Sequence, residues 1–152
     1  MQTAFKFFGF CLAFVAFVSN MAMAQVSIGG KTVLGRWKTI DDETSAAKSI
    51  VELYEENGKL FGRVKELFRK PDEDQNPVCK DCTDSRKNQP IRNMVIVRNM
   101  VKYSDKYADG DILDPKKGKI YDCTLWLESA DVLKVRGWWG FVYRTQTWYR
   151  VP

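Results

Sequence analysis

The chain has 152 residues and 45% of them are hydrophobic, which suffices for about one domain with a buried core. It contains no histidine, so neither Ser-His-Asp or Cys-His catalysis nor a histidine-based metal site is expected, and an enzyme would have to work with other side chains. The formal net charge is +5, but the basic residues are interleaved with Asp and Glu, which argues against nucleic-acid binding.

The N-terminal segment has the three parts of an export signal. Lys6 gives a weakly basic start, residues 7–18 form an apolar run, and Ala-Met-Ala at 22–24 is a cleavage site before Gln25. The apolar run is shorter than the roughly 20 residues that a membrane-spanning helix needs. We therefore expect residues 1–24 to be a cleaved signal peptide, and the mature protein to lie in the periplasm or outside the cell without spanning the membrane.

Residues 28–152 are predicted to form a single β domain. Short runs rich in Val, Ile, Leu and aromatic residues alternate with turn signals at intervals of roughly ten residues, which is typical of an all-β meander. Asn57-Gly58 tolerates the positive φ of a tight hairpin between two such runs. Eight runs are predicted as strands: 34–40, 49–54, 59–67, 91–97, 111–113, 119–127, 132–138 and 145–151.

The first run shows which face of the sheet is buried. Closing an antiparallel sheet removes its exposed edges, and a barrel of about eight strands either is filled by side chains or holds one small ligand. Gly35, Trp37 and Thr39 share one face, while Arg36 and Lys38 share the other, so the tryptophan is expected to point inward. Trp37 is therefore predicted to close one end of the barrel and is a candidate ligand contact. Gly35, lacking a Cβ, is predicted to let a neighbouring group approach the backbone closely.

Two resemblances follow from these motifs. The Gly-Arg-Trp motif at 35–37 resembles that of lipocalin and avidin-like barrels, in which the tryptophan closes one end. Together with CKDC, ILDPKKGKIYDC, LKVRGWWG and TQTWYRV, it resembles, over nearly the whole mature chain, the family catalogued as domain of unknown function 2147 (DUF2147). This resemblance implies a small exported bacterial protein with a lipocalin-like, up-and-down antiparallel barrel of about eight strands. It implies no particular activity.

The lipocalin resemblance also implies an arginine from a late strand that packs across the tryptophan. Three arginines are candidates: Arg136, Arg144 and Arg150. We select Arg150, because the final strand must pair with the first to close the barrel and so brings this residue near Trp37. A cation–π contact between the two side chains is the expected structural role.

The long polar stretch at 68–90 carries two cysteines of a CxxC motif, Cys79 and Cys82. A zinc site would need Cys123 and a carboxylate as further ligands, and catalytic thiol exchange would need a βαβ setting that is not predicted here. A structural disulfide suits an exported protein best. Proximity favours the pair Cys79–Cys82, with Cys123 as a small buried hydrophobic residue, although a bridge from either cysteine to Cys123 stays open.

Five further residues are candidate ligand contacts: Asp114, Tyr121, Arg136, Trp138 and Trp139. Asp114 precedes a proline and has the alternative role of capping a turn. Arg136 shares a face with Val132 and Lys134, opposite two apolar neighbours, and has the alternative role of a solvated or structural cation. Adjacent strand residues point to opposite faces, so just one of Trp138 and Trp139 is expected to face the interior.

Three classes of function remain. The favoured one is a non-catalytic binder or carrier of a small, mostly apolar ligand, because no catalytic constellation is recognisable. A barrel filled by its own aromatic residues would instead be a ligand-free envelope or interaction protein. An enzyme using Asp114 with Tyr121 or Arg136 is the third class. No metal or cofactor is expected, and the oligomeric state is not predicted.

Overall fold

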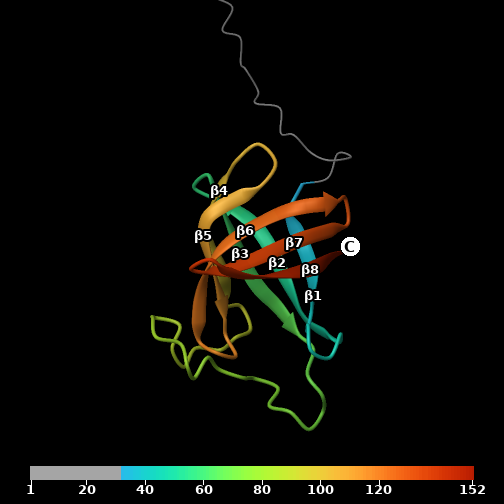
Figure 1. Ribbon diagram of the computed structural model, residues 1–152. Helices are drawn as coiled ribbons and strands as arrows, with labels where there is room; N and C mark the ends of the chain where they lie inside the picture. The colour runs from blue at the N-terminus through green and yellow to red at the C-terminus, as the bar shows by residue number, and fades with distance from the viewer. Residues whose placement is uncertain (1–31) are drawn as a thin grey trace, which may run out of the picture.

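The computed structural model describes residues 32–152, which form one closed antiparallel β-barrel without a helix (Figure 1). Each strand pairs with the next in the chain, and β8 pairs with β1, so the predicted up-and-down barrel of eight strands is confirmed. The predicted signal peptide at 1–24 and the start of the domain at 28–31 lie outside the described residues. The strands are β1 (Gly35–Ile40), β2 (Ala47–Glu56), β3 (Lys59–Leu67), β4 (Val95–Lys102), β5 (Tyr107–Asp114), β6 (Lys119–Ser129), β7 (Val132–Trp139) and β8 (Val142–Val151).

The fourth and fifth strands differ from the prediction. β4 begins four residues later than predicted and continues to Lys102, and β5 begins at Tyr107 instead of residue 111. Asn99 and Asp109 have left-handed φ angles of 57° and 58°, and the pairing of β5 with β6 shifts register after Tyr107. Such irregularities break the period of two, so the sequence alternation is lost where the strands continue.

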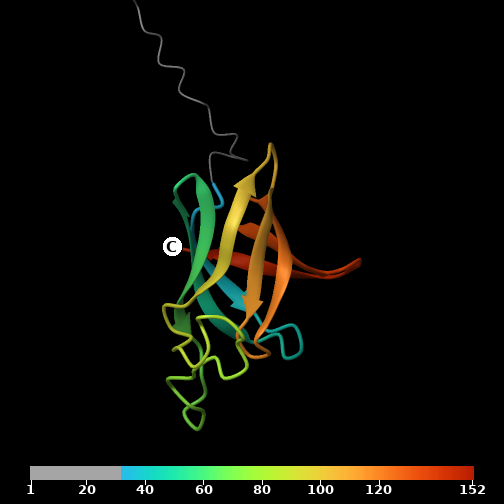
Figure 2. The same ribbon diagram turned by 90° about the vertical axis from the view of Figure 1, so that its left-hand side faces the viewer.

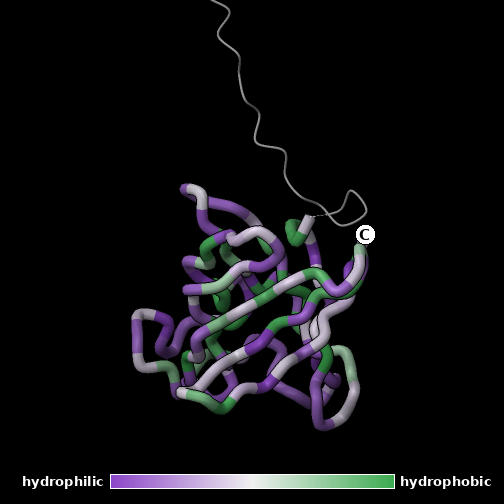
Figure 3. The backbone as a smooth tube through the Cα atoms, turned by 45° about the horizontal axis from the view of Figure 1, so that its top comes forward, coloured by the Kyte–Doolittle hydropathy of each residue, from purple (hydrophilic) through white to green (hydrophobic). Residues whose placement is uncertain are grey.

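The strands bury one face as the alternation predicts. In β1, Trp37 and Thr39 are buried, whereas Arg36 and Lys38 are only partly covered. Figure 3 shows hydrophilic and hydrophobic positions interspersed along the chain. The turn at Asn57-Gly58 has φ angles of 52° and 73°, as the predicted tight hairpin requires.

One end of the barrel is closed by Trp37, whose side chain is fully buried. Its Nε1–H donates to the carbonyl of Val33 at 2.8 Å. Arg150 lies opposite Trp37 in the β1–β8 register, and its guanidinium carbon is 4.2 Å from the indole centroid. The predicted packing of Arg150 over Trp37 is therefore present. A Cβ on Gly35 would lie 3.3 Å from an Arg150 nitrogen, so the glycine leaves room for the guanidinium.

The opposite end carries the longer connections. The 68–94 segment between β3 and β4 extends beyond that end, below the barrel in Figure 1, and the turn between β5 and β6 lies beside it. Among residues 32–152 there is no helix of the length and hydropathy that crossing a bilayer demands.

Candidate ligand cavity

A cavity of about 330 Å³ lies inside the barrel, toward the end away from Trp37. The position follows from its lining, which includes Ile40 at the end of β1, Lys48 near the start of β2 and Leu67 at the end of β3. In an antiparallel barrel these three positions meet at the same end. Pockets that hold small molecules typically span about 300 to 1,000 Å³, so the cavity can accommodate one small ligand.

The walls of the cavity are mainly apolar. The side chains come from strands that are far apart in the sequence, which is why the cavity exists only in the closed barrel. Apolar residues of the wall include Val64, Ile96, Ile112, Leu113, Val135 and Trp148. Such a lining favours a ligand whose buried part is hydrocarbon.

A short polar strip crosses one wall. The hydroxyls of Thr39 and Ser49 are 2.7 Å apart, so they satisfy each other inside the barrel. The indole N–H of Trp148 donates to the Gln146 side-chain oxygen at 3.2 Å, and the Gln146 amide donates to Asp42 at 2.9 Å. These polar side chains already have hydrogen-bond partners within the protein, so they need none from a ligand.

The charged residues that line the cavity lie near its mouth. Three are cations, Lys48, Lys117 and Arg144, and one is a carboxylate, Asp114. Arg144 already pairs with Asp42 at 2.9 Å. Two lysines and one carboxylate remain, so the mouth has a small excess of positive charge around an apolar interior, which suits a ligand with an acidic end.

Three of the six predicted ligand contacts line the cavity: Asp114, Tyr121 and Trp139. Asp114 also caps its turn, since the Lys116 N–H donates to its carboxylate at 3.0 Å, so its alternative role is present too. Tyr121 stands beside Gly137, where a Cβ would lie 3.4 Å from the Tyr121 Cβ. Gly137, which the sequence reasoning missed, keeps this part of the cavity open because it has no side chain.

The other three predicted contacts lie outside the lining, and this corrects the predicted set. Trp37 is the closed floor. Arg136 and Trp138 lie on the outer wall, because Val135 and Gly137 take the inner positions of β7. The guanidinium of Arg136 stacks 4.2 Å from the Tyr143 ring, and its Nε–H donates to Thr145 at 2.8 Å. Arg136 is thus a structural cation, the alternative that its strand position allowed.

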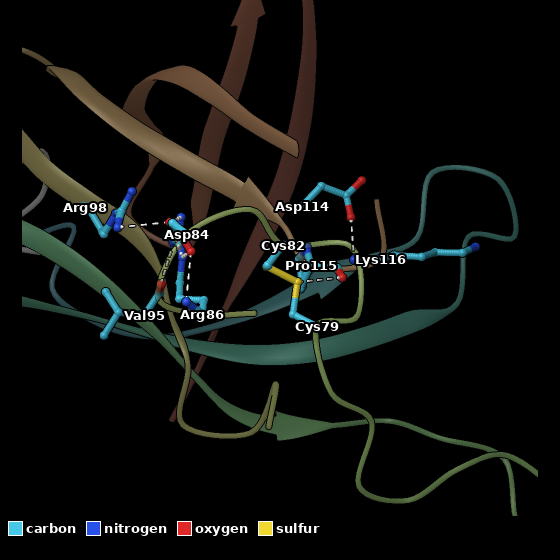
Figure 4. The surroundings of a disulfide bond; sticks show 9 residues. All are labelled: Cys79, Cys82, Asp84, Arg86, Val95, Arg98, Asp114, Pro115 and Lys116. Carbon is cyan, nitrogen blue, oxygen red and sulfur yellow. Dashed lines mark hydrogen bonds and ion pairs between the residues drawn. A yellow bond between two sulfur atoms is a disulfide. The ribbon is translucent and has the colours of Figure 1, made fainter. Parts of the chain in front are cut away.

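The predicted Cys79–Cys82 disulfide is confirmed, with the two Cα atoms 5.5 Å apart (Figure 4). The Cys79 sulfur lies 3.3 Å from the Pro115 carbonyl oxygen, so the bridge packs on the β5–β6 turn. A Cβ on Gly118 would come within 2.0 Å of the Asp81 carbonyl oxygen. The loop and the turn are therefore in direct backbone contact beside the mouth.

Cys123 is a free, buried cysteine on β6, as predicted. Burial, and secondarily the charge of Asp111, raises the pKa of its thiol to about 12. The nucleophilic thiolate is thus suppressed, and the residue acts as a small hydrophobic group.

A second anchor holds the same loop to the barrel wall. The Asp84 carboxylate accepts hydrogen bonds from the Arg86 guanidinium, with the shortest at 2.7 Å, and lies 3.6 Å from the Arg98 guanidinium on β4. Arg86 also donates to the Val95 carbonyl at 3.0 Å (Figure 4). The hydrogen bond from Arg86 is the main reason that the pKa of Asp84 is lowered from 3.8. Sequence reasoning missed this network because Asp84 and Arg98 meet only after β4 has paired in the sheet.

Comparison with known proteins agrees with this architecture. The structure is similar to that of protein HP1028 from the human pathogen Helicobacter pylori, which belongs to the lipocalin family, with a TM-score of 0.68 and 21% sequence identity. The similarity covers 80% of this chain and 84% of that one, and at this identity it establishes the fold alone. No curated protein matches the sequence. Residues 35–150 match the family described as "Uncharacterized protein conserved in bacteria (DUF2147)", and the chain belongs to this family.

Proposed function

We propose that this protein binds and carries a small, mostly apolar ligand in an exported compartment. The observation that supports the proposal is the cavity of about 330 Å³, apolar along its walls and closed at the far end by Trp37. Lys48 and Lys117 at the mouth favour a ligand whose outer end is acidic. Export rests on the predicted signal peptide at residues 1–24.

The first experiment is native mass spectrometry of protein purified from the exported fraction of its source. A co-purifying small molecule of constant mass is the expected result. Purified, delipidated protein should then bind dodecanoate more tightly than dodecanol. The alkyl chains of both probes fill the cavity, but only dodecanoate has a carboxylate that the lysines attract.

Three variants make this test specific. Gly137→Val adds bulk to the cavity wall beside Tyr121, so it should weaken the binding of both probes while the barrel stays folded. Lys48→Gln should weaken dodecanoate binding alone. Lys65→Gln, which removes the same charge from β3 at an outward position, is the matched control and should change neither. Failure of the protein to bind either probe, or an unchanged affinity in Gly137→Val, would contradict the proposal.

A ligand-free interaction protein is the second candidate. The observation that favours it is a group of exposed apolar side chains at the tip of the β7–β8 hairpin, of which Phe141 is the most exposed. Under this alternative the cavity stays empty in native mass spectra and the hairpin tip carries the function. The enzyme alternative loses one proposed partner, because Arg136 lies on the outer wall, away from Asp114 and Tyr121 in the lining.

A further inference from the structure

The connection between β7 and β8 ends in an exposed apolar tip, residues 139–143 with the sequence WGFVY. We call these residues the aromatic tip. The Phe141 side chain is 94% exposed and that of Trp139 is 74% exposed, and Val142 and Tyr143 are exposed as well. Figure 2 shows the hairpin projecting sideways past the other strands of the barrel. A cluster of large apolar side chains exposed to water is typical of an interaction site.

The base of the tip is braced by aromatic packing. The Trp138 and Tyr143 rings pack at a centroid distance of 4.7 Å, and Arg136 stacks on both. Gly140 turns the chain with a φ of 59°, and a Cβ there would meet no atom within 4 Å. The open space at this turn agrees with the exposure of the neighbouring Phe141.

Cations surround the tip. The Lys119 ammonium lies 5.5 Å from the centroid of the Trp139 ring, which shows that the β5–β6 turn is adjacent to the tip. Lys116 and Lys117 lie on that turn, and both are exposed. The cationic side chains on these adjoining turns and strands include Lys116, Lys117, Lys119, Arg136 and Arg144, and the neighbouring carboxylates include Asp42, Asp81, Asp114 and Asp122. Positive charge is in excess around an apolar centre.

We propose that the aromatic tip docks the protein on the surface of a membrane that contains anionic lipid. Trp and Tyr side chains favour the boundary between headgroups and acyl chains, and neighbouring lysines attract anionic headgroups. A narrow, convex tip can enter a deformable lipid surface, whereas a stable protein interface engages about 20 to 30 residues on each side. The occupant is therefore a lipid surface and not a second copy of this chain.

Docking at this place has a geometric consequence. Trp139, Val142 and Tyr143 belong both to the aromatic tip and to the lining of the cavity. Insertion of the tip would bring the mouth of the cavity against the lipid. Membrane docking itself does not require that the cavity holds a ligand, so it can be tested without one.

The test is co-sedimentation of the exported protein with vesicles of phosphatidylcholine alone and of phosphatidylcholine mixed with phosphatidylglycerol. Binding to the mixed vesicles, weakened by salt, is expected, with much weaker binding to the neutral ones. Phe141→Ser should lower the partition coefficient by about tenfold, because a polar group replaces the phenylalanine that would enter the lipid. Lys116→Gln and Lys119→Gln should each lower it by about fivefold.

Tyr103→Ser is the matched control, because Tyr103 is an exposed aromatic residue between β4 and β5, at the other end of the barrel. It should bind vesicles as the parent does, and thermal melting should show all four variants folded. Equal binding to both vesicle types, or full binding by Phe141→Ser, would overturn the proposal. A concentration-dependent dimer that Phe141→Ser abolishes would overturn it too, by assigning the tip to a second copy.

Discussion

At the scale of single residues, Arg150 does more at the closed end than stack on Trp37. Its guanidinium donates hydrogen bonds to the carbonyl oxygens of Thr32, Leu34 and Ala130. The segment before β1 and the turn between β6 and β7 are thereby tied together above the indole ring. The arginine is thus a structural clamp, with its N–H donors satisfied along the edge of the guanidinium and the Trp37 ring stacked against one face.

This clamp predicts a strong coupling between Trp37 and Arg150. Trp37→Ala should lower the free energy of unfolding by about 3 to 5 kcal/mol, since a large buried side chain leaves a cavity. Arg150→Ala should cost about 2 to 4 kcal/mol, because three carbonyls lose a charged donor. Denaturant melts of the single and double variants should give non-additive effects, with a coupling of about 0.5 to 3 kcal/mol.

Arg150→Lys is the control for that cycle, because it keeps the charge and loses the planar group that reaches three acceptors and covers the ring. Arg150→Lys should be only slightly more stable than Arg150→Ala. Additive effects of Trp37→Ala and Arg150→Ala would show that the two side chains do not depend on each other.

At the scale of elements, the 68–94 segment is held beside the mouth by the β5–β6 turn and by β4. The disulfide alone closes a small ring and so constrains the unfolded chain little. Contacts with the barrel therefore matter more: the Cys79 sulfur against Pro115, the close backbone approach at Gly118, and the ion pair between Asp84 and Arg98. Each of the last two contacts can be tested separately.

Gly118→Ala should displace the loop from the turn. Its φ of 64° strains any side chain, and its Cβ would lie 2.0 Å from the Asp81 oxygen. Gly58→Ala is the matched control, with a φ of 73° and no atom within 4 Å, so it should cost only the backbone strain of about 1 to 2 kcal/mol. Gly118→Ala should cost about 1 to 3 kcal/mol more. Denaturant melts and protease cleavage within 68–94 measure the difference, and equal losses would refute the contact.

The Asp84 anchor predicts a loss of stability in acid. Because Arg86 lowers the pKa of Asp84 from 3.8, the folded state favours the ionised carboxylate. The stabilisation is complete above the unfolded value near 3.8, and it is lost as the pH falls through the lower folded pKa. Asp84→Asn should remove this part of the acid dependence and destabilise the protein at neutral pH.

Denaturant melts over a series of pH values test this, with Asp72→Asn as the control. Asp72 is an exposed aspartate of the same loop. Its substitution should leave the acid dependence as in the parent. An Asp84→Asn variant with the parent's stability at neutral pH would contradict the anchor.

At the scale of the whole molecule, the barrel is asymmetric from end to end. Trp37 and Arg150 seal one end, whereas the cavity, the disulfide loop and the aromatic tip gather toward the other. Ligand uptake and surface docking would therefore share one end of the barrel.

Export predicts that the mature protein begins at Gln25. Intact mass of the exported form should lack residues 1–24, and Ala24→Phe, which spoils the small-x-small site, should retain them. Ala16→Leu is the control, because it keeps the apolar run apolar and should be processed normally. An exported form that still carries residues 1–24, or that carries lipid, would contradict the prediction.

The fold follows from patterns that are local in the sequence. Successive residues of a strand point to opposite faces, so the inward position of Trp37 was predictable from its neighbours. Two cysteines three positions apart are close in any compact chain, so the Cys79–Cys82 bridge was predictable as well. The period failed at Asn99 and Asp109, where the backbone takes a left-handed φ.

The cavity and the aromatic tip depended on the tertiary structure. Whether an eight-stranded barrel is filled or hollow depends on the sizes of side chains that meet from distant strands, such as Gly137 beside Tyr121. Alternation separated Trp138 from Trp139, but only the structure shows that Trp139 both lines the cavity and is largely exposed, because it lies at the end of β7 where few other residues cover it. The exposure of Phe141 likewise required the three-dimensional structure, because an apolar residue stays outside only where no other part of the chain reaches it.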